Sequence, residues 1–167
     1  MNKVTNIVLG GLGGQGVLTA SDILADAAFR AGFDVKKSEL HGMSQRGGSV
    51  SSDVRYGPRV LSPMVPAGEA DFLLVLESTQ VEVNRPVLKS DGVLISIDVI
   101  PAGAVKNKKS LNVAMLGALS ALLDIPEMAW LDAIHARLAA KLHRLNDEAF
   151  AIGRAAAIQR FNPPGQA

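Results

Sequence analysis

The chain has 167 residues, 48% of them hydrophobic and 20% charged, and a formal net charge of +1. That length suits one globular domain that needs no disulfide or metal to fold, and the near-neutral charge argues against a general role on nucleic acids or membrane surfaces. Because the sequence has no cysteine, the chain has no thiolate to hold an iron–sulfur cluster or to act as a redox nucleophile.

The chain opens on a short β-rich run, residues 4–9. No charged region, apolar stretch and small-residue cleavage site precede this run, so the sequence predicts no signal peptide. No apolar run approaches the length needed to span a bilayer. We therefore expect a cytoplasmic protein with neither a membrane nor a nucleic acid among its partners.

The first strand leads through a glycine-rich turn into a run with helical spacing over residues 17–30. Gly32 follows that run, as glycine commonly does at a helix C-terminus. Residues 33–37 form the next predicted strand. These elements predict a βαβ unit whose second strand lies parallel to the first, joined by a right-handed crossover.

The rest of the chain alternates strands with helices and then becomes helical. Period-two alternation over residues 50–56 is typical of a half-buried strand, whereas the unbroken apolar runs of the later strands indicate burial on both faces. After a loop at 38–48, the predicted elements are strands 50–56, 72–76 and 93–97, a short helix 78–88, and helices 111–122, 128–142 and 146–161. Pro126 fits the first turn of the helix that follows it.

This succession predicts an α/β fold, namely a Rossmann-like open, mostly parallel sheet with helices on both faces and a helical C-terminal third. No internal repeat divides the sequence. We expect a single domain over residues 1–161 and a flexible tail over residues 162–167, which contains two prolines and a glycine.

The turn after the first strand carries the pattern G-x-G-x-x-G on Gly11, Gly13 and Gly16, and its place between a strand and a helix gives the pattern meaning. Glycines let the backbone approach a pyrophosphate, while the helix N-terminus supplies amide donors and the positive end of a dipole. The alternative is a tight turn that packs against another subunit.

The end of the second strand bears on which nucleotide would bind. A nicotinamide-binding domain would place an acidic residue there to hold the ribose. Here the sequence reads Lys36-Lys37-Ser38-Glu39, so Glu39 comes late and the paired lysines suit a phosphate better than a bare ribose. We therefore discount NAD and keep a phosphorylated nucleotide such as coenzyme A (CoA) or NADP.

A second motif, Gln45-Arg46-Gly47-Gly48, places a bidentate cation beside two permissive residues, which suits a clamp on a phosphate or carboxylate. The alternative is a surface loop whose arginine pairs with Glu39 or with a partner chain. His41 has the right chemistry for an acid or base, but a lone loop histidine without a companion carboxylate or nucleophile is more often a contact residue.

The remaining histidines and a basic run have simpler explanations. His135 and His143 lie in the helical region without further residues at metal-ligand spacing, so we expect them to be structural. Lys106, Lys108 and Lys109 precede the helix at residue 111, where a solvated loop is the simplest interpretation.

Two segments together, GGLGGQGVLTA at residues 10–20 and SELHGMSQRGGSV at residues 38–50, resemble the gamma-type domain of the 2-oxoacid:ferredoxin oxidoreductases. The resemblance is strongest to the small (beta) subunit of indolepyruvate oxidoreductase. Later pieces agree, namely Ala70-Asp71, Asn112 with the Leu116-Gly117 pair, and residues 146–153. The second motif is far more specific than the glycine turn alone.

The resemblance implies a complex in which thiamine diphosphate on other subunits decarboxylates a 2-oxoacid. Iron–sulfur clusters on partner subunits would carry electrons to ferredoxin or another acceptor, and CoA would receive the acyl group. The gamma-type domain is similar to the piece that helps to hold CoA, and no catalytic side chain or metal ligand carries over. The absence of cysteine and of a Gly-Asp-Gly motif agrees with this division of labour.

Motif and resemblance together give the expected cofactor-binding residues: Gly11, Gly13, Gly14, Gln15, Gly16, Gln45, Arg46, Gly47 and Asn112. The expected substrate is an arylpyruvate or a related aryl 2-oxoacid, although relatives act on other 2-oxoacids and the region after Gly57 is short for this kind of subunit. Two other functions stay open. One is a free-standing NADP- or flavin-dependent reductase, for which His41 is the visible acid–base candidate, and the other is a structural interaction domain.

Overall fold

The computed structural model describes residues 3–41 and 47–162, without the side chain of His41. Two expected site residues, Gln45 and Arg46, lie outside the described residues. The expected flexible tail also lies outside them, except for Asn162.

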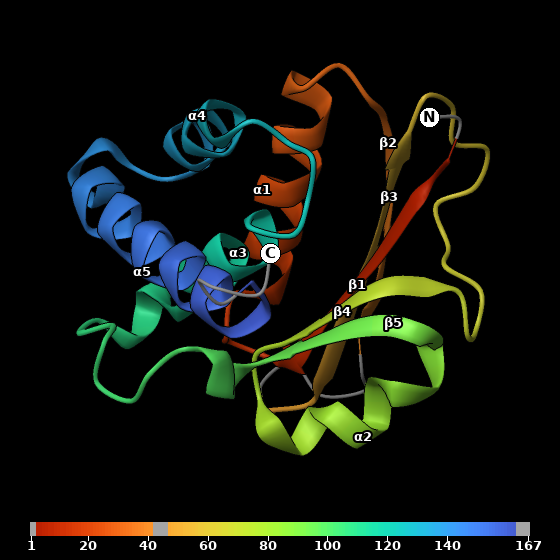
Figure 1. The fold of residues 1–167 in the computed structure, drawn as a ribbon, viewed down its shortest axis with the longest axis horizontal. Coiled ribbons are helices and arrows are strands. Elements are labelled where there is room, and N and C mark those ends of the chain that lie inside the picture. Colours follow the sequence, from red (N-terminus) through yellow and green to blue (C-terminus); the bar gives the residue numbers. More distant parts are fainter. Residues whose placement is uncertain (1–2, 42–46, 163–167) are drawn as a thin grey trace.

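The described residues form one five-stranded sheet in the order β2-β3-β1-β4-β5 (Figure 1). The strands are β1 Thr5–Leu12, β2 Asp34–His41, β3 Ser49–Gly57, β4 Ala70–Val75 and β5 Leu88–Ser96. β4 is parallel to both β1 and β5, while β3 is antiparallel to both β1 and β2. Four of these five strands therefore run in one direction, which confirms the mostly parallel sheet.

The predicted βαβ unit differs in one respect, because β3 lies between the two strands that were expected to be neighbours. β2 and β3 form an antiparallel hairpin from Asp34↔Gly57 to His41↔Val50, and β3 pairs along its whole length with β1. This hairpin also extends β2 through residues 38–41, which were predicted as a loop. The pairing to β3 satisfies backbone groups that a loop would leave to water.

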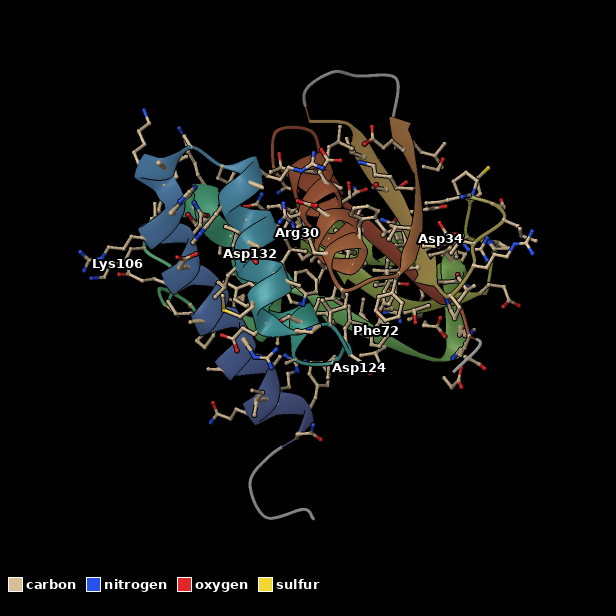
Figure 2. The ribbon with its side chains drawn as sticks, turned by 90° about the horizontal axis from the view of Figure 1, so that it is seen from above. Arg30, Asp34, Phe72, Lys106, Asp124 and Asp132 are labelled. Atoms are coloured by element: carbon tan, nitrogen blue, oxygen red, sulfur yellow. The ribbon has the colours of Figure 1, made fainter. Side chains whose placement is uncertain are left out.

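Four helices cover one face of the sheet: α1 Val17–Arg30, α3 Leu111–Ser120, α4 Glu127–Arg137 and α5 His143–Phe161. Figure 2 shows this helical layer beside the sheet from above. The other face is covered by the short helix α2 Val81–Asn84, its flanking 3₁₀ turns and the segment 58–69, whose Val65 packs with Val8 and Leu73. Helices on both faces were predicted, and the two layers prove very unequal in size.

The helix boundary after α4 differs from the prediction of one helix over residues 128–142. Leu138 is extended, with φ −113° and ψ 148°, and a 3₁₀ turn at Ala140–Leu142 leads into α5. Pro126 is the residue before α4 and does not lie in its first turn. The break turns the start of α5 toward the carboxyl edge of the sheet.

α3 and α5 approach each other so closely that two glycines are required between them. An added Cβ on Gly117 would lie 2.0 Å from the carbonyl oxygen of Phe150, and one on Gly153 would lie 1.7 Å from that of Ala114. Both atoms are backbone, so neither contact is relieved by a rotamer change. The pair fixes the position of α3 and α5, whose first turns contribute to the site described below.

Substituting Gly153→Ala should therefore destabilise the protein by at least about 2 kcal/mol, because the helices must separate to admit the methyl group. Helix propensity alone predicts the opposite, a gain of about 1 kcal/mol. Urea unfolding of the variant and the parent measures the difference. Ala151→Gly, at an exposed position of the same helix, calibrates the propensity effect, and a Gly153→Ala variant more stable than the parent would contradict the close contact.

Candidate functional site

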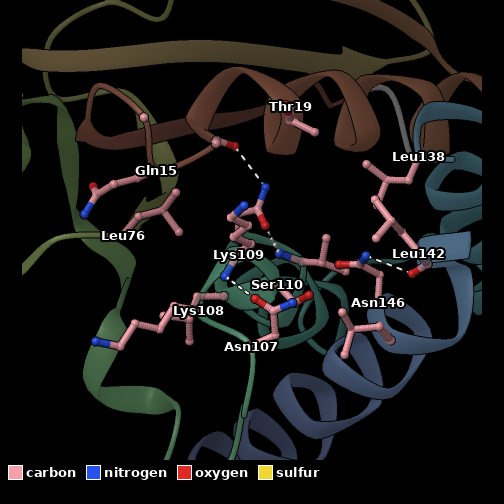
Figure 3. A pocket seen from close by; sticks show the side chains of 16 residues that line it. Gln15, Thr19, Leu76, Asn107, Lys108, Lys109, Ser110, Leu138, Leu142 and Asn146 are labelled. Carbon is pink, nitrogen blue, oxygen red and sulfur yellow. Dashed lines mark hydrogen bonds between the residues drawn. The ribbon is translucent and has the colours of Figure 1, made fainter. Parts of the chain in front are cut away.

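A cavity of about 610 Å³ lies at the carboxyl ends of β1 and β4, among the first turns of α1, α3 and α5 (Figure 3). It is lined by Gly14, Gln15, Gly16, Thr19, Leu76, Asn107, Lys108, Lys109, Ser110, Leu111, Asn112, Val113, Leu138, Leu142, Leu145 and Asn146. The lining thus contains four of the expected site residues, Gly14, Gln15, Gly16 and Asn112. Asn112 lies far along the chain from the three residues of the glycine turn, and it meets them because α3 packs beside α1.

The glycine turn has the geometry that the motif predicts. Gly14 has φ +89° and Gly16 has φ +80°, conformations that other residues rarely adopt, and Gly16 is the cap of α1. The amides of the first helical turn have no acceptor within the helix, so they remain available to a ligand. Gly14 is exposed and has no heavy atom within 4 Å of an added Cβ, so its requirement is conformational.

Asn112 fastens the start of α1 to the start of α3. Its Nδ2 donates to the carbonyl oxygen of Gly16 at 3.2 Å, and its side chain is only 7% exposed. An added Cβ on Gly16 would lie 2.5 Å from that Nδ2. Gly16 is therefore required both for its backbone conformation and for the close approach of Asn112, which acts as a positioning residue for the turn.

Gln15 braces the same turn from the other side. Its Oε1 accepts from the amide of Leu12 at 2.7 Å, and its Nε2 donates to Oε2 of Glu77 at 3.1 Å. An added Cβ on Gly11 would lie 2.9 Å from that Oε1. Gly11 lies outside the cavity lining, and its contribution is the space that it leaves for the Gln15 side chain.

Two further expected residues lie beside the cavity without lining it. The amide of Gly13 donates to the carbonyl oxygen of Gly48 at 2.9 Å, which ties the glycine turn to the start of β3. Gly47, with φ +75°, precedes that contact. The other two residues of this motif, Gln45 and Arg46, lie outside the described part of the chain.

The site also contains residues that the sequence analysis missed. Lys108 and Lys109 line the cavity, although they were predicted as a solvated loop. Asn107 orders this segment, because its Oδ1 accepts from the amide of Lys109 at 3.0 Å. A basic run directly before the helix that begins at Leu111 and carries Asn112 was the signal that could have placed them at the site.

The opposite wall is apolar and comes from Leu138, Leu142 and Leu145. It ends at Asn146, which is 4% exposed and donates from Nδ2 to the carbonyl oxygen of Leu142 at 2.9 Å. The sequence analysis missed this wall because residues 138–142 were predicted as the end of the helix 128–142.

The two histidines of this region stabilise the break. His135 and His143 stack with ring centroids 4.2 Å apart, and Nε2 of His143 lies 2.8 Å from the carbonyl oxygen of Leu138. Nε2 of His135 lies 2.8 Å from both carboxylate oxygens of Asp147. These contacts agree with the expected structural role, and no group of metal-ligating side chains occurs among the residues that the structure describes.

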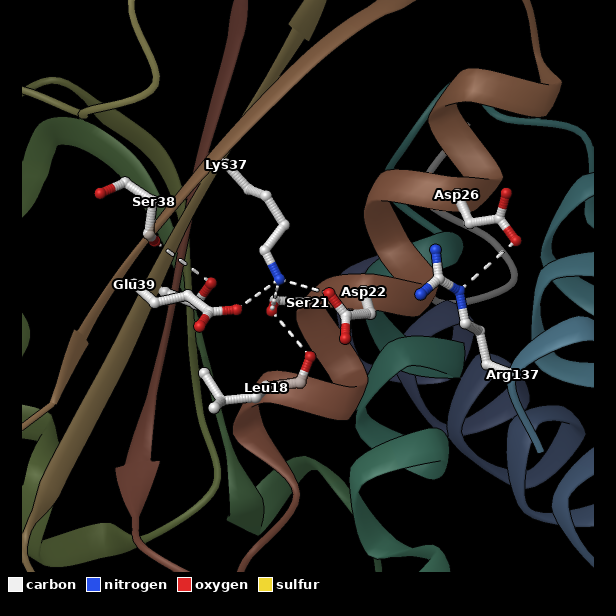
Figure 4. A network of polar contacts seen from close by, with 9 residues as sticks. Leu18, Ser21, Asp22, Asp26, Lys37, Ser38, Glu39 and Arg137 are labelled. Carbon is white, nitrogen blue, oxygen red and sulfur yellow. Dashed lines mark hydrogen bonds and ion pairs between the residues drawn. The ribbon is translucent and has the colours of Figure 1, made fainter. Parts of the chain in front are cut away.

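The lysine pair at 36–37 lies on β2, away from the cavity. Lys37 contacts Asp22 and Glu39, with its Nζ 2.6 Å from Oε1 of Glu39, and also lies 3.2 Å from Oγ of Ser21 (Figure 4). Burial lowers the pKa of Lys37, but the hydrogen bonds and charges of the two carboxylates outweigh it, so its pKa is raised overall. Lys37 is thus paired with two carboxylates of its own chain, and phosphate binding by the lysine pair stays a prediction.

The cavity favours an anion. Of the described residues that line it, two are lysines and none is an aspartate or glutamate. The first turns of α1, α3 and α5 all face it, and a helix N-terminus carries a partial positive charge and free amides. With the leucine wall opposite, the site suits a phosphorylated ligand that also has a sizeable apolar part.

A glycine turn that opens a helix at the carboxyl edge of a mostly parallel sheet defines an α/β domain with the strand–turn–helix arrangement that Rossmann-like folds share. The sequence pattern of the pyruvate ferredoxin/flavodoxin oxidoreductase family matches residues 6–156. The chain therefore belongs to this family. Among the described residues, no helix is long and apolar enough to cross a membrane.

Relatives with known sequences support the assignment. The chain is 47% identical over 94 residues to indolepyruvate oxidoreductase subunit IorB of Thermococcus kodakarensis, a match that covers 56% of this chain and 46% of that protein. The chain thus spans about half the length of these curated relatives.

Solved structures agree on the fold. The gamma subunit of a keto/oxoacid ferredoxin oxidoreductase from Geobacter sulfurreducens matches with a TM-score of 0.80 at 25% identity, over 93% of this chain and 97% of that one. The 2-oxoglutarate:ferredoxin oxidoreductase of Magnetococcus marinus, solved with 2-oxoglutarate, coenzyme A and succinyl-CoA bound, matches with a TM-score of 0.78 at 23% identity. That match covers 94% of this chain and 31% of the larger one.

The contact between Gly16 and Asn112 can be tested by a double-mutant cycle. Gly16→Ala should cost roughly 2–3 kcal/mol through the positive φ and the clash with Nδ2, and Asn112→Ala about 1 kcal/mol through the lost hydrogen bond. Because Asn112→Ala also removes the clash, the double variant should cost less than the sum of the two. Denaturant unfolding of the four proteins measures the coupling, and strictly additive costs would refute this contact.

Proposed function

We propose that this chain is the gamma-type subunit of a CoA-acylating 2-oxoacid oxidoreductase that depends on thiamine diphosphate. In that complex it binds CoA and assembles with the subunits that carry the redox centres. The observation that carries the proposal is the cavity beside the glycine turn, with two lysines, three helix N-termini and no carboxylate in its lining.

The residues at the cavity fit the chemistry of CoA. Its phosphates match the free amides at the start of α1 and the ammonium groups of Lys108 and Lys109. The adenine ring needs an apolar surface, which Leu138, Leu142 and Leu145 offer. The Magnetococcus enzyme that shares the fold holds CoA and succinyl-CoA, but at 23% identity that likeness extends to the fold alone, so the proposal rests on the cavity.

The redox and carbon–carbon chemistry belongs to partner subunits. A chain without cysteine cannot supply the thiolates that hold iron–sulfur clusters, so those clusters, like thiamine diphosphate, would lie on the partners. Thiamine diphosphate would supply the carbanion chemistry for decarboxylation, and the clusters would pass electrons to ferredoxin or another acceptor. This chain would contribute the CoA that accepts the acyl group. The cytoplasmic location of the complex stays a prediction.

The CoA site predicts the effect of reversing the two lysine charges. Lys108→Glu combined with Lys109→Glu should weaken CoA binding by at least about tenfold, because hydrogen bonds to charged groups contribute more than 1.4 kcal/mol. Calorimetry with CoA, on the full chain and on the complex with which it co-purifies, measures the loss.

Arg59→Glu is the matched control for that experiment. Arg59 is exposed and follows β3 at the opposite edge of the sheet, and its substitution changes the net charge in the same direction. Equal effects of the control and of the lysine variants would reject a CoA site at the cavity, and so would CoA binding by neither the chain nor the complex.

The 2-oxoacid that we propose is an arylpyruvate, since the Thermococcus relative at 47% identity is an indolepyruvate oxidoreductase subunit. The co-purified complex should therefore oxidise indolepyruvate with a kcat/KM at least about tenfold above that for pyruvate. Reduction of a low-potential dye in the presence of CoA measures both rates. A preference for pyruvate would overturn the substrate assignment and leave the CoA site untouched.

The other two functions make different predictions for the same protein. A free-standing reductase would bind NADPH or a flavin in place of CoA and would need an acid–base residue, yet no histidine, carboxylate or tyrosine lines the described cavity. A structural domain would bind neither ligand. Competition between NADPH and CoA in the binding experiment separates the three.

A further inference from the structure

A second cleft of about 540 Å³ lies where the chain leaves β5. It is lined by Ile97, Ile100, Pro101, Ala102, Gly103, Val105, Lys106, Lys108 and Leu111. The cleft shares Lys108 and Leu111 with the first cavity, so these two residues form the wall between the two hollows. Figure 3 shows Lys108 among the residues of the first cavity, with its side chain extended away from Gln15.

The two hollows differ in chemistry. The first has the glycine turn, three helix N-termini and two asparagines near its lysines. The second is bounded mainly by aliphatic side chains such as those of Ile97, Ile100 and Val105, with lysines only at its rim and no carboxylate in its described lining. A ligand that occupies both needs an anionic end joined to a long neutral arm.

We propose that the second cleft holds the pantetheine arm of CoA or of its thioester, with the phosphates in the first cavity. This inference rests on the proposed function. The arm is uncharged and flexible, so it requires a groove that removes its methylene and methyl groups from water, and the aliphatic walls provide this. Lys108, which lines both hollows, lies where the diphosphate joins the arm.

This placement also gives the ligand a direction. The adenosine phosphates lie at the glycine turn, and the thiol emerges at the segment 100–106, on the side of the molecule where Lys106 projects outward in Figure 2. The partner subunit that forms the acyl group must then lie against this segment. No residue of this chain is required to react.

Filling the second cleft should weaken the binding of CoA, which has the arm, and leave the binding of the nucleotide part unchanged. Ala102 is exposed and lines the cleft, so Ala102→Trp fills it without disturbing the core. CoA should bind at least about tenfold more weakly to this variant, whereas 3′-phospho-ADP, which has the phosphates but no arm, should bind within about twofold of the parent. Ala155→Trp, an exposed alanine on α5 outside both linings, is the matched control and should leave both affinities unchanged.

The calorimetric experiment uses the full chain in its co-purified complex, and each of its results supports or overturns a proposal. Equal losses for the two ligands, or no loss for either, would overturn the arm site. Loss of the partner subunits with CoA binding intact would make the cleft a subunit interface, which also overturns it. Failure of the parent complex to bind either ligand would instead reject the proposed CoA function itself.

A measurement on the unaltered protein covers the case in which Ala102→Trp does not fold. Reductive methylation followed by mass spectrometry reports which lysines a ligand shields. CoA should protect Lys106, which lines only the second cleft, whereas 3′-phospho-ADP should leave it reactive. Lys108 should be protected by both ligands, and the exposed Lys141, which lines neither hollow, by neither. Equal reactivity of Lys106 with and without CoA would overturn the proposal.

Discussion

The site depends on the hydrogen bonds that fix the glycine turn between α1 and α3. Asn112 holds the carbonyl of Gly16 from α3, while Gln15 spans from the amide of Leu12 to Glu77. The turn is thereby fixed beside the cavity before a ligand arrives, which lowers the entropic cost of binding. Because Gly117 and Gly153 set how closely α3 meets α5, the opposite wall of the cavity is fixed by the same packing.

The side chains at the described cavity indicate which steps this chain can perform. The described cavity has the chemistry of a binding site, with backbone amides, two lysines and an apolar wall, and no acid–base side chain apart from the lysines lines it. A rigid glycine turn and the dipole of the helix that follows it can bind an anion without a redox centre. An oxidoreductase family can therefore keep such a chain separate from the subunits that carry the redox centres. The chain spans about half the length of the curated indolepyruvate oxidoreductase subunits that it matches.

Much of this could be predicted from residues alone, because the signals were local. Apolar and β-rich runs predicted the five strands, and the glycine spacing predicted a turn between the first strand and the first helix, which β1 and α1 confirm. Secondary structure was assigned wrongly where a contact with another segment of the chain determines the local conformation. Residues 38–41 are strand only because β3 pairs with them, and Leu138 interrupts a helical pattern through contacts made by His143.

The sequence by itself determined the family, the order of elements and the glycine turn, because each of them depends on residues that are close together in the chain. Tertiary structure decided which residues meet that turn. Asn112 lies 96 positions from Gly16, and Lys108, Lys109 and the leucines of the α4–α5 junction reach the cavity only through packing of helices whose contacts no spacing encodes. Propensity acts over a few residues, whereas a binding site is made by surfaces that folding brings together from far along the chain.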